Sequence, residues 1–156
     1  MNFRNKAVLF LATGCFTGYI RWAPGTFGSL LGLPLCWVLS GLSLKLALPL
    51  TLIFMLVAIV LSQAAEKILD QKDPGCIVID EIAGLLVTFI GLPFTFSTAL
   101  AGFCVFRAMD ITKPFPIRVI ESKLPGGSGV VIDDVAAGIY SNIVVRILLV
   151  FIHLLK

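Results

Sequence analysis

Two short acidic segments carry the residue types best able to do chemistry in this sequence. One contains Asp80-Glu81 and the other Asp133-Asp134, and each pair follows a Val-Ile dipeptide and precedes a strongly apolar run. Adjacent carboxylates beside such hydrophobic sequence are costly to bury unless something neutralises their charge. Hard divalent cations prefer oxygen ligands. If the two pairs converge, we therefore expect all four carboxylates to bind such a cation.

Helix capping is the alternative interpretation of the two acidic pairs. An Asp at a helix start accepts hydrogen bonds from free backbone amides and complements the helix dipole. One acid per helix would be enough for that purpose, so two adjacent acids in both segments favour metal binding. Ala83-Gly84 and Ala137-Gly138 follow the pairs. Small residues allow helices to approach closely, which would bring the two pairs together.

Two further motifs contain groups that could bind a phosphate. In Arg107-x-x-Asp110-x-x-Lys113-Pro114 the two cations suit phosphate oxygens, although cations also complement an ordinary helix end. Residues 23–29 are rich in Gly and include Thr26 and Ser29, ahead of an apolar run. Backbone amides at such a helix start can bind an anion, and a tight turn is the alternative.

The composition indicates a membrane protein. The 156 residues are 58% hydrophobic and only 13% charged, against roughly 25% charged in soluble domains, and the mean hydropathy is +1.04. A net charge of +3 is too small to favour nucleic acid as a partner and is compatible with an anionic lipid surface. The length fits one domain, covering residues 1–156.

The apolar runs predict an all-α fold, a compact membrane bundle of about five helices, some short or broken. Residues 1–13 are a basic lead into a short apolar run, and residues 14–29 are predicted to form a shaped loop. Helices are predicted at residues 30–43, 46–64, 82–91, 95–108 and 135–155, with polar loops at 65–80 and 109–134. Arg146 interrupts the last helix and should face protein or snorkel to the membrane surface.

Alternating the direction of these helices places the three loops that carry the motifs on one side of the membrane. That side has most of the basic residues, namely Arg4, Lys6, Arg21, Lys67, Lys72, Lys113, Arg118 and Lys123. The opposite side has Lys45 and Lys156. The positive-inside rule therefore predicts a multi-pass membrane protein with its site facing the cytoplasm.

Four sequence blocks, in this order, resemble the phosphatidylglycerophosphatase A family. They are Ala23-Pro24-Gly25-Thr26-x-Gly28-Ser29, Asp73-Pro74-x-x-Ile77-Val78-x-Asp80-Glu81-x-x-Gly84, Phe106-Arg107-x-x-Asp110-Ile111-x-Lys113-Pro114-x-Pro116-Ile117 and Gly127-x-Gly129-Val130-x-x-Asp133-Asp134-x-x-Ala137-Gly138. Each block is modest alone, and the combination, across residues 23–138, is highly specific. The resemblance implies a Mg²⁺-dependent hydrolase that converts phosphatidylglycerophosphate to phosphatidylglycerol and phosphate. It also implies that the protein lies in the bacterial cytoplasmic (inner) membrane.

That resemblance implies roles for individual residues. Mg²⁺ would bind the carboxylates of Asp80, Glu81, Asp133 and Asp134. A water activated by the metal is the expected nucleophile, and an aspartyl nucleophile stays open. Asp110 would orient the water or complete the metal shell. The phosphate would be bound by Lys113 and Arg107, with Thr26 and Ser29 as hydrogen-bond donors. The alternative function is a small membrane cation transporter or channel component, because intramembrane acids also line ion paths.

Overall fold

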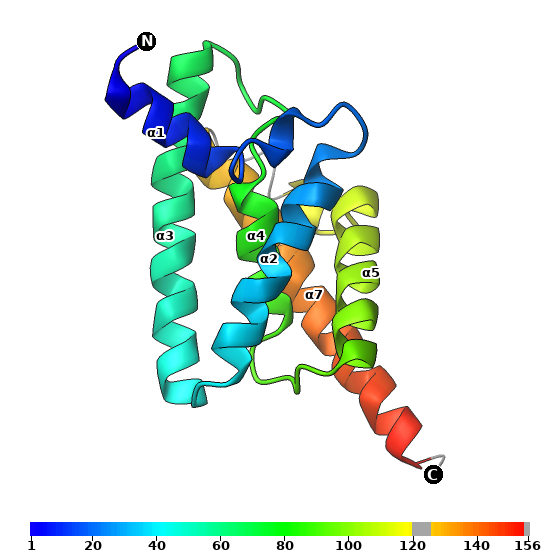
Figure 1. Cartoon of the computed structure of the whole chain (residues 1–156). Helices are drawn as coiled ribbons and strands as arrows, with labels where there is room; N and C mark the ends of the chain where they lie inside the picture. Colours follow the sequence, from blue (N-terminus) through cyan, green and yellow to red (C-terminus); the bar gives the residue numbers. More distant parts are fainter. Residues whose placement is uncertain (120–125, 155–156) are drawn as a thin grey trace.

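The computed structural model describes residues 1–119 and 126–154, and these form helices joined by short connections (Figure 1). The α-helices with described bounds are α1 (Phe3–Ala12), α2 (Pro24–Ser40), α3 (Leu44–Leu69), α4 (Ile79–Thr88), α5 (Phe96–Thr112) and α7 (Gly127–Leu154). A short 3₁₀ helix covers Thr17–Tyr19, and residues 117–119 are also helical. The predicted all-α bundle is confirmed, with α1 as an addition to the expected helices.

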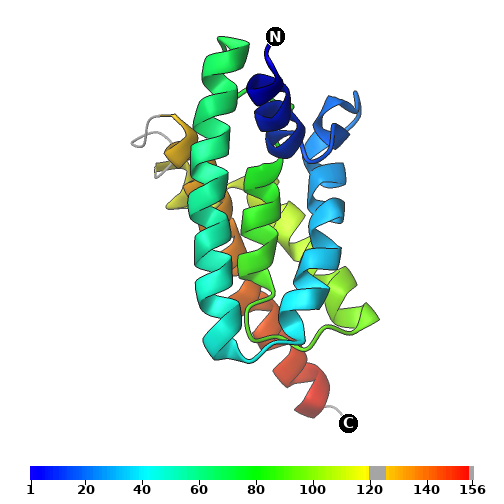
Figure 2. The same ribbon diagram turned by 60° about the vertical axis from the view of Figure 1, so that its left-hand side comes forward.

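Helix α4 forms the centre of the bundle. It contacts α2, α3, α5 and α7, and both ribbon views place it between its neighbours (Figures 1 and 2). Every residue of α4 except Glu81 is buried. A helix that is apolar on all sides belongs in the interior, and this one carries its acidic pair in its first turn. The bundle therefore surrounds one of the two acidic segments.

The predicted close approach of the two glycine-bearing helices is confirmed. A Cβ atom added at Gly138 of α7 would lie 2.3 Å from the carbonyl oxygen of Gly84 in α4. A Cβ added at Gly84 would lie 2.5 Å from the carbonyl oxygen of Asp134. Only glycine allows the two backbones to pack at this distance. This crossing holds α4 directly against the acidic segment of α7.

The predicted loop over residues 14–29 is wrong beyond Ala23, because α2 already begins at Pro24. Proline suits the first position of a helix, where its missing N–H would have had no partner. Gly28, which suggested a loop, instead packs against another segment: a Cβ there would lie 2.4 Å from the Cβ of Val78. Tertiary contact explains why this glycine-rich segment is helical.

The predicted loop over residues 109–134 is wrong at both ends, since α5 continues to Thr112 and α7 begins at Gly127. A Cβ at Gly127 would lie 2.5 Å from the backbone nitrogen of Gln63 in α3, so this glycine is also a packing residue. Asp133 and Asp134 consequently lie about two turns inside α7. The capping alternative is wrong for this pair.

Within residues 1–119 and 126–154, two helices, α3 and α7, are long and apolar enough to cross a membrane, with mean hydropathies of 2.6 and 2.1 in their most apolar windows. Helix α2 is apolar but has 17 residues, about 26 Å at 1.5 Å per residue. Exposed side chains of α3 include Leu52, Ile53, Leu56 and Val60. Lys123 and Lys156, which entered the orientation argument, lie outside the described residues.

Arg146 faces protein, as expected for a charge within an apolar helix. Its guanidinium donates hydrogen bonds to the carbonyl oxygens of Ile90 (2.8 Å) and Gly91 (3.2 Å), just beyond the end of α4. Its Nε donates to Asn142 Oδ1 at 2.8 Å, and the Asn142 amide donates to the carbonyl oxygens of Thr88 and Ile90. These bonds join the end of α4 to α7.

We expect Arg146→Met to destabilise the protein by about 0.5–1.5 kcal/mol for each hydrogen bond that it removes, to Ile90, Gly91 and Asn142. The Ile90 carbonyl would still accept a hydrogen bond from the Asn142 amide, which limits the loss. Thermal unfolding in detergent measures this loss. Ile147→Met is the matched control, because Ile147 is an exposed side chain of the same helix. Equal unfolding temperatures for the two variants would show that the Arg146 hydrogen bonds between α7 and the end of α4 do not stabilise the protein.

Candidate functional site

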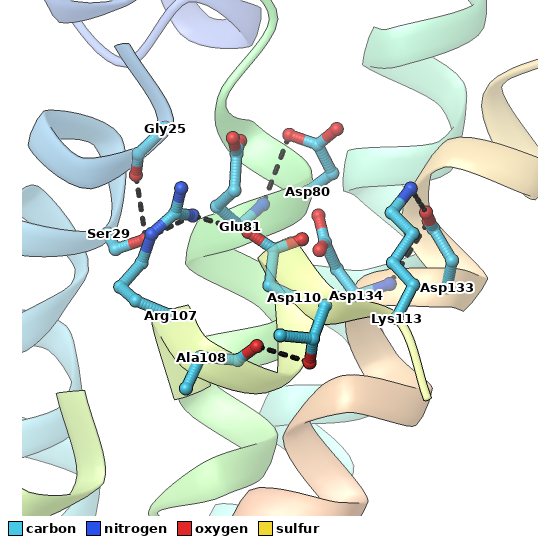
Figure 3. A network of polar contacts seen from close by, with 11 residues as sticks. Gly25, Ser29, Asp80, Glu81, Arg107, Ala108, Asp110, Lys113, Asp133 and Asp134 are labelled. Atoms are coloured by element: carbon cyan, nitrogen blue, oxygen red, sulfur yellow. Dashed lines mark hydrogen bonds and ion pairs between the residues drawn. The ribbon is translucent and has the colours of Figure 1, made fainter. Parts of the chain in front are cut away.

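Carboxylates from different helices converge near the start of α4 (Figure 3). Asp80 and Glu81 come from the first turn of α4, and Asp134 comes from α7. One carboxylate oxygen from each of the three lies within 4.8 Å of the others. Asp110, near the end of α5, interacts with Asp134 and points toward the same cluster. The structure therefore brings the two acidic segments to one place, as the sequence predicted.

The cluster is deeply buried. Asp80 is 5% exposed and Asp134 is 4% exposed. Burial raises the pKa of Asp80 well above its usual range, and the neighbouring Glu81 raises it further. Burial also raises the pKa of Glu81. One oxygen of Glu81, Oε2, is buried and lacks a hydrogen-bond partner among the described residues. An all-oxygen donor set with an unsatisfied buried oxygen suits a hard divalent cation.

A polar cavity of about 300 Å³ opens beside the carboxylates. Its lining residues are Ala23, Pro24, Gly25, Asp73, Gly75, Ile77, Asp80, Glu81, Arg107, Asp110, Lys113, Val130, Asp133 and Asp134. Seven of the nine predicted site residues are therefore in its wall. The other two, Thr26 and Ser29, are not in that wall.

Arg107 is held at the cavity by two neighbours. Its Nη1 lies 2.6 Å from Asp110 Oδ2 and donates a longer hydrogen bond, 3.4 Å, to Ser29 Oγ. The Ser29 hydroxyl is fully buried and donates to the carbonyl oxygen of Gly25 at 2.7 Å. Ser29, predicted as a donor to substrate, therefore contacts Arg107 instead. Arg107, which was predicted to bind the phosphate, lines the cavity.

Gly25 allows the start of α2 to approach the acidic cluster. A Cβ added there would lie 2.1 Å from Glu81 Oε1 and 3.1 Å from both terminal nitrogens of Arg107. No larger residue fits without moving one of the two charged side chains. Sequence reasoning considered this glycine only as part of a turn or an anion-binding loop. Its contact with two charged groups depends on how α2, α4 and α5 pack.

Lys113 and Asp133 form an ion pair across the cavity wall, with Lys113 Nζ 2.5 Å from Asp133 Oδ2. Lys113 ends α5 in a left-handed conformation, with a φ of 42°, and Pro114 follows it. Asp133 Oδ1 also accepts a hydrogen bond from the backbone nitrogen of Asp134. Three of the four predicted metal ligands therefore lie together, and the fourth, Asp133, forms an ion pair with Lys113 instead. Its role as a ligand stays a prediction.

Asp73 is a cavity residue that the sequence analysis did not single out for chemistry. It lines the cavity, its charge acts on Asp80, and its backbone nitrogen donates to Glu66 Oε1 at 2.9 Å. The residue has a φ of 47°, and Pro74 follows it. The Asp-Pro-Gly sequence indicated only a turn. The one sign in the sequence that Asp73 belongs to the site is that it begins the second of the four family-like blocks.

The chain is similar to known proteins along most of its length. A family model described as phosphatidylglycerophosphatase A matches residues 10–149. The chain is 42% identical over 137 residues to a phosphatidylglycerophosphatase A of Haemophilus influenzae, covering 86% of this chain and 84% of that protein. It is 34% identical over 132 residues to the Escherichia coli protein of the same name, covering 84% and 77%.

A third relative has a different name. A putative phosphatidylinositol-3-phosphatase of Bacteroides thetaiotaomicron is 33% identical over 151 residues, covering 89% of this chain and 91% of that protein. No solved structure matches the chain. The matched span includes every cavity residue described above.

Proposed function

Because the chain belongs to the phosphatidylglycerophosphatase A family, a family of phosphatases, we propose that it hydrolyses the terminal phosphate of phosphatidylglycerophosphate. The products are phosphatidylglycerol and inorganic phosphate, and residues 1–156 act as one domain. The observation that carries the proposal is the single cavity in which three clustered carboxylates face Arg107 and Lys113. This combination suits a phosphomonoester and favours an enzyme over a cation transporter.

We propose that Asp80, Glu81 and Asp134 hold a Mg²⁺ ion. When bound, the ion would neutralise phosphate charge and act as a Lewis acid. Support comes from the three oxygens within 4.8 Å of one another and from the unsatisfied Glu81 Oε2. Without a cation, these buried carboxylates raise one another's cost of ionisation. Asp133 is placed to hold Lys113 at the cavity.

The remaining cavity residues bind the phosphate and position the attacking water. Arg107 and Lys113 donate charge-assisted hydrogen bonds to phosphate oxygens. Ser29 keeps Arg107 in place through its hydroxyl, and Thr26 stays a predicted donor at the start of α2. Asp110 faces the carboxylate cluster and orients the water. A phosphomonoester needs little covalent assistance from the protein, so positioning and charge neutralisation supply most of the rate.

The proposed location is the bacterial cytoplasmic (inner) membrane, with the chain crossing it several times and the site facing the cytoplasm. The apolar helices α3 and α7 support the membrane location. The orientation rests on the excess of basic residues on the side that carries the motifs. In this orientation the cavity lies where α2 and α4 begin and α5 ends, on the side that a lipid headgroup would occupy.

Phosphate release from a panel of lipids tests both the substrate and the metal. The panel contains phosphatidylglycerophosphate, phosphatidic acid and a phosphatidylinositol phosphate, the last because of the name of one relative. We expect metal-stripped enzyme to be inactive and added Mg²⁺ to restore hydrolysis of phosphatidylglycerophosphate most efficiently. Full activity in excess EDTA would remove the metal assignment. Preference for another lipid would overturn the substrate.

A further inference from the structure

The connection between α3 and α4 forms part of the wall of the polar cavity. It covers residues 70–78, between the end of α3 at Leu69 and the start of α4 at Ile79 (Figure 1). Three of its residues, Asp73, Gly75 and Ile77, line the cavity. The position of this non-helical segment therefore affects the shape and the charge of the site.

Asp73 is the residue of this connection that brings a charge to the cavity. The wall contains six acidic residues, and three of them form the carboxylate cluster. Two others, Asp110 and Asp133, form ion pairs with the two cations of the wall. The sixth is Asp73, whose charge acts on Asp80 of the cluster. Asp73 therefore adds a carboxylate beside the proposed cation site.

The backbone of Asp73 has a conformation that needs support from its surroundings. Its φ of 47° is left-handed, and Pro74 follows it. A proline restricts the backbone of the residue before it. A left-handed conformation at a residue other than glycine costs free energy and persists only where the surrounding structure fixes it. A contact from outside the turn is therefore expected to hold Asp73.

Glu66, in the last turn of α3, supplies this contact. Its Oε1 accepts a hydrogen bond from the backbone nitrogen of Asp73 at 2.9 Å. Its backbone carbonyl oxygen accepts hydrogen bonds from the nitrogens of Asp70 and Gln71, the first two residues of the connection. Glu66 is not among the residues that line the cavity. It can therefore act on the site through the connection that it holds.

The second half of the connection is held by backbone groups. The nitrogen of Ile77 donates to the carbonyl oxygen of Pro74 at 2.9 Å, and that of Val78 donates to the carbonyl oxygen of Ala12 at 2.9 Å. A side-chain substitution at Glu66 leaves these two bonds in place and removes the bond at Asp73. The position of Asp73 can thus be changed without altering a residue of the cavity wall.

We propose that Glu66 is a positioning residue of the site, which holds the Asp73 backbone so that the Asp73 carboxylate faces the Mg²⁺ ion. The proposal rests on the proposed function, since it assumes the cation held by Asp80, Glu81 and Asp134. Asp73 then adds a negative charge on the exposed side of that cation site. Glu66 acts on the ion only through Asp73.

Calorimetric titration of Mg²⁺ into metal-stripped protein tests this assignment without a substrate. Asp73→Asn and Glu66→Ala should each weaken Mg²⁺ binding about 10- to 100-fold, the usual effect of removing a group that orients a metal site. Asp70→Asn is the control, because Asp70 is an exposed acid of the same connection that does not line the cavity. Wild-type affinity in Asp73→Asn or in Glu66→Ala would overturn the proposal.

Two conservative variants separate the reach of Glu66 from its charge. Glu66→Gln removes the charge and keeps an oxygen acceptor at the same distance along the side chain. Glu66→Asp keeps the charge and shortens the side chain by one methylene, so the bond to the Asp73 nitrogen is lost. We expect Glu66→Gln to bind Mg²⁺ like wild type and Glu66→Asp to bind it as weakly as Glu66→Ala. The reverse order would show that Glu66 acts through its charge.

The double variant separates positioning from a general structural role. Because Glu66 acts through Asp73, adding Glu66→Ala to Asp73→Asn should weaken Mg²⁺ binding no further. A further loss would overturn the positioning role. If wild-type protein bound no Mg²⁺, the proposed cation site would fail together with this inference. Wild-type binding beside an unchanged Glu66→Ala variant would remove this inference alone.

Discussion

Asp80→Asn and Asp134→Asn should each lower kcat about 100- to 1000-fold, a loss of the size measured when one preorganised charge-stabilising group is removed from an active site. Both carboxylates belong to the cluster of oxygens within 4.8 Å. An amide keeps the shape of the side chain and removes the charge that would hold the cation. Phosphate release from phosphatidylglycerophosphate at saturating Mg²⁺ measures the effect.

The double variant distinguishes one site from two. Residues that act as a unit show non-additive losses, so we expect Asp80→Asn with Asp134→Asn to cost much less than the product of the single losses. Asp70→Asn is the control, because Asp70 is exposed at the end of α3 and is not among the cavity residues. Multiplicative losses would show that the two segments have independent roles.

Stability measured without metal separates a catalytic role from a structural one. Asp80 Oδ1 accepts a hydrogen bond from the backbone nitrogen of Glu81 at 3.0 Å, and an Asn oxygen can keep this bond. Asp80→Asn also removes a buried charge, whose ionisation is costly beside Glu81. We therefore expect the unfolding temperature of the metal-free variant to equal or exceed that of wild type. A marked decrease in the unfolding temperature would indicate that the Asp80 carboxylate has a mainly structural role.

Gly138→Ala should both destabilise the bundle and abolish most of the activity. The new Cβ would lie 2.3 Å from the carbonyl oxygen of Gly84, so the backbones of α4 and α7 must separate. Overpacking of this kind costs about 1–3 kcal/mol, which exceeds the gain of roughly 1 kcal/mol from better helix propensity. Separation also moves Asp134 away from Asp80 and Glu81. Thermal unfolding and phosphate release measure the two effects.

Gly41→Ala is the matched control for this prediction. Gly41 ends α2 with a φ of −76°, and its added Cβ would meet only the Val38 carbonyl oxygen at an ordinary 3.5 Å. The same substitution is therefore made without a clash, and we expect near wild-type stability and activity. If Gly138→Ala behaved like Gly41→Ala, the close helix crossing would not be what holds the carboxylates together.

The sequence by itself determined the helical class, the long apolar helices and the residue types of the site. Apolar runs bounded by polar segments predict helices, and α3, α4 and α5 occur near their expected positions. The paired acids and the small residues after them correctly indicated that α4 and α7 meet. These features depend on local composition and spacing, which one chain displays directly.

Only the tertiary structure decided which groups share the cavity. Successive residues of an α-helix point roughly 100° apart, so Asp134 joins the cluster while its neighbour Asp133 turns to Lys113. Likewise, Ser29 lies inside the bundle and supports Arg107. The glycine-rich starts of α2 and α7 are helical because distant segments, at Val78 and Gln63, pack against them. Such contacts join residues that are far apart in the chain, so local sequence patterns cannot predict them.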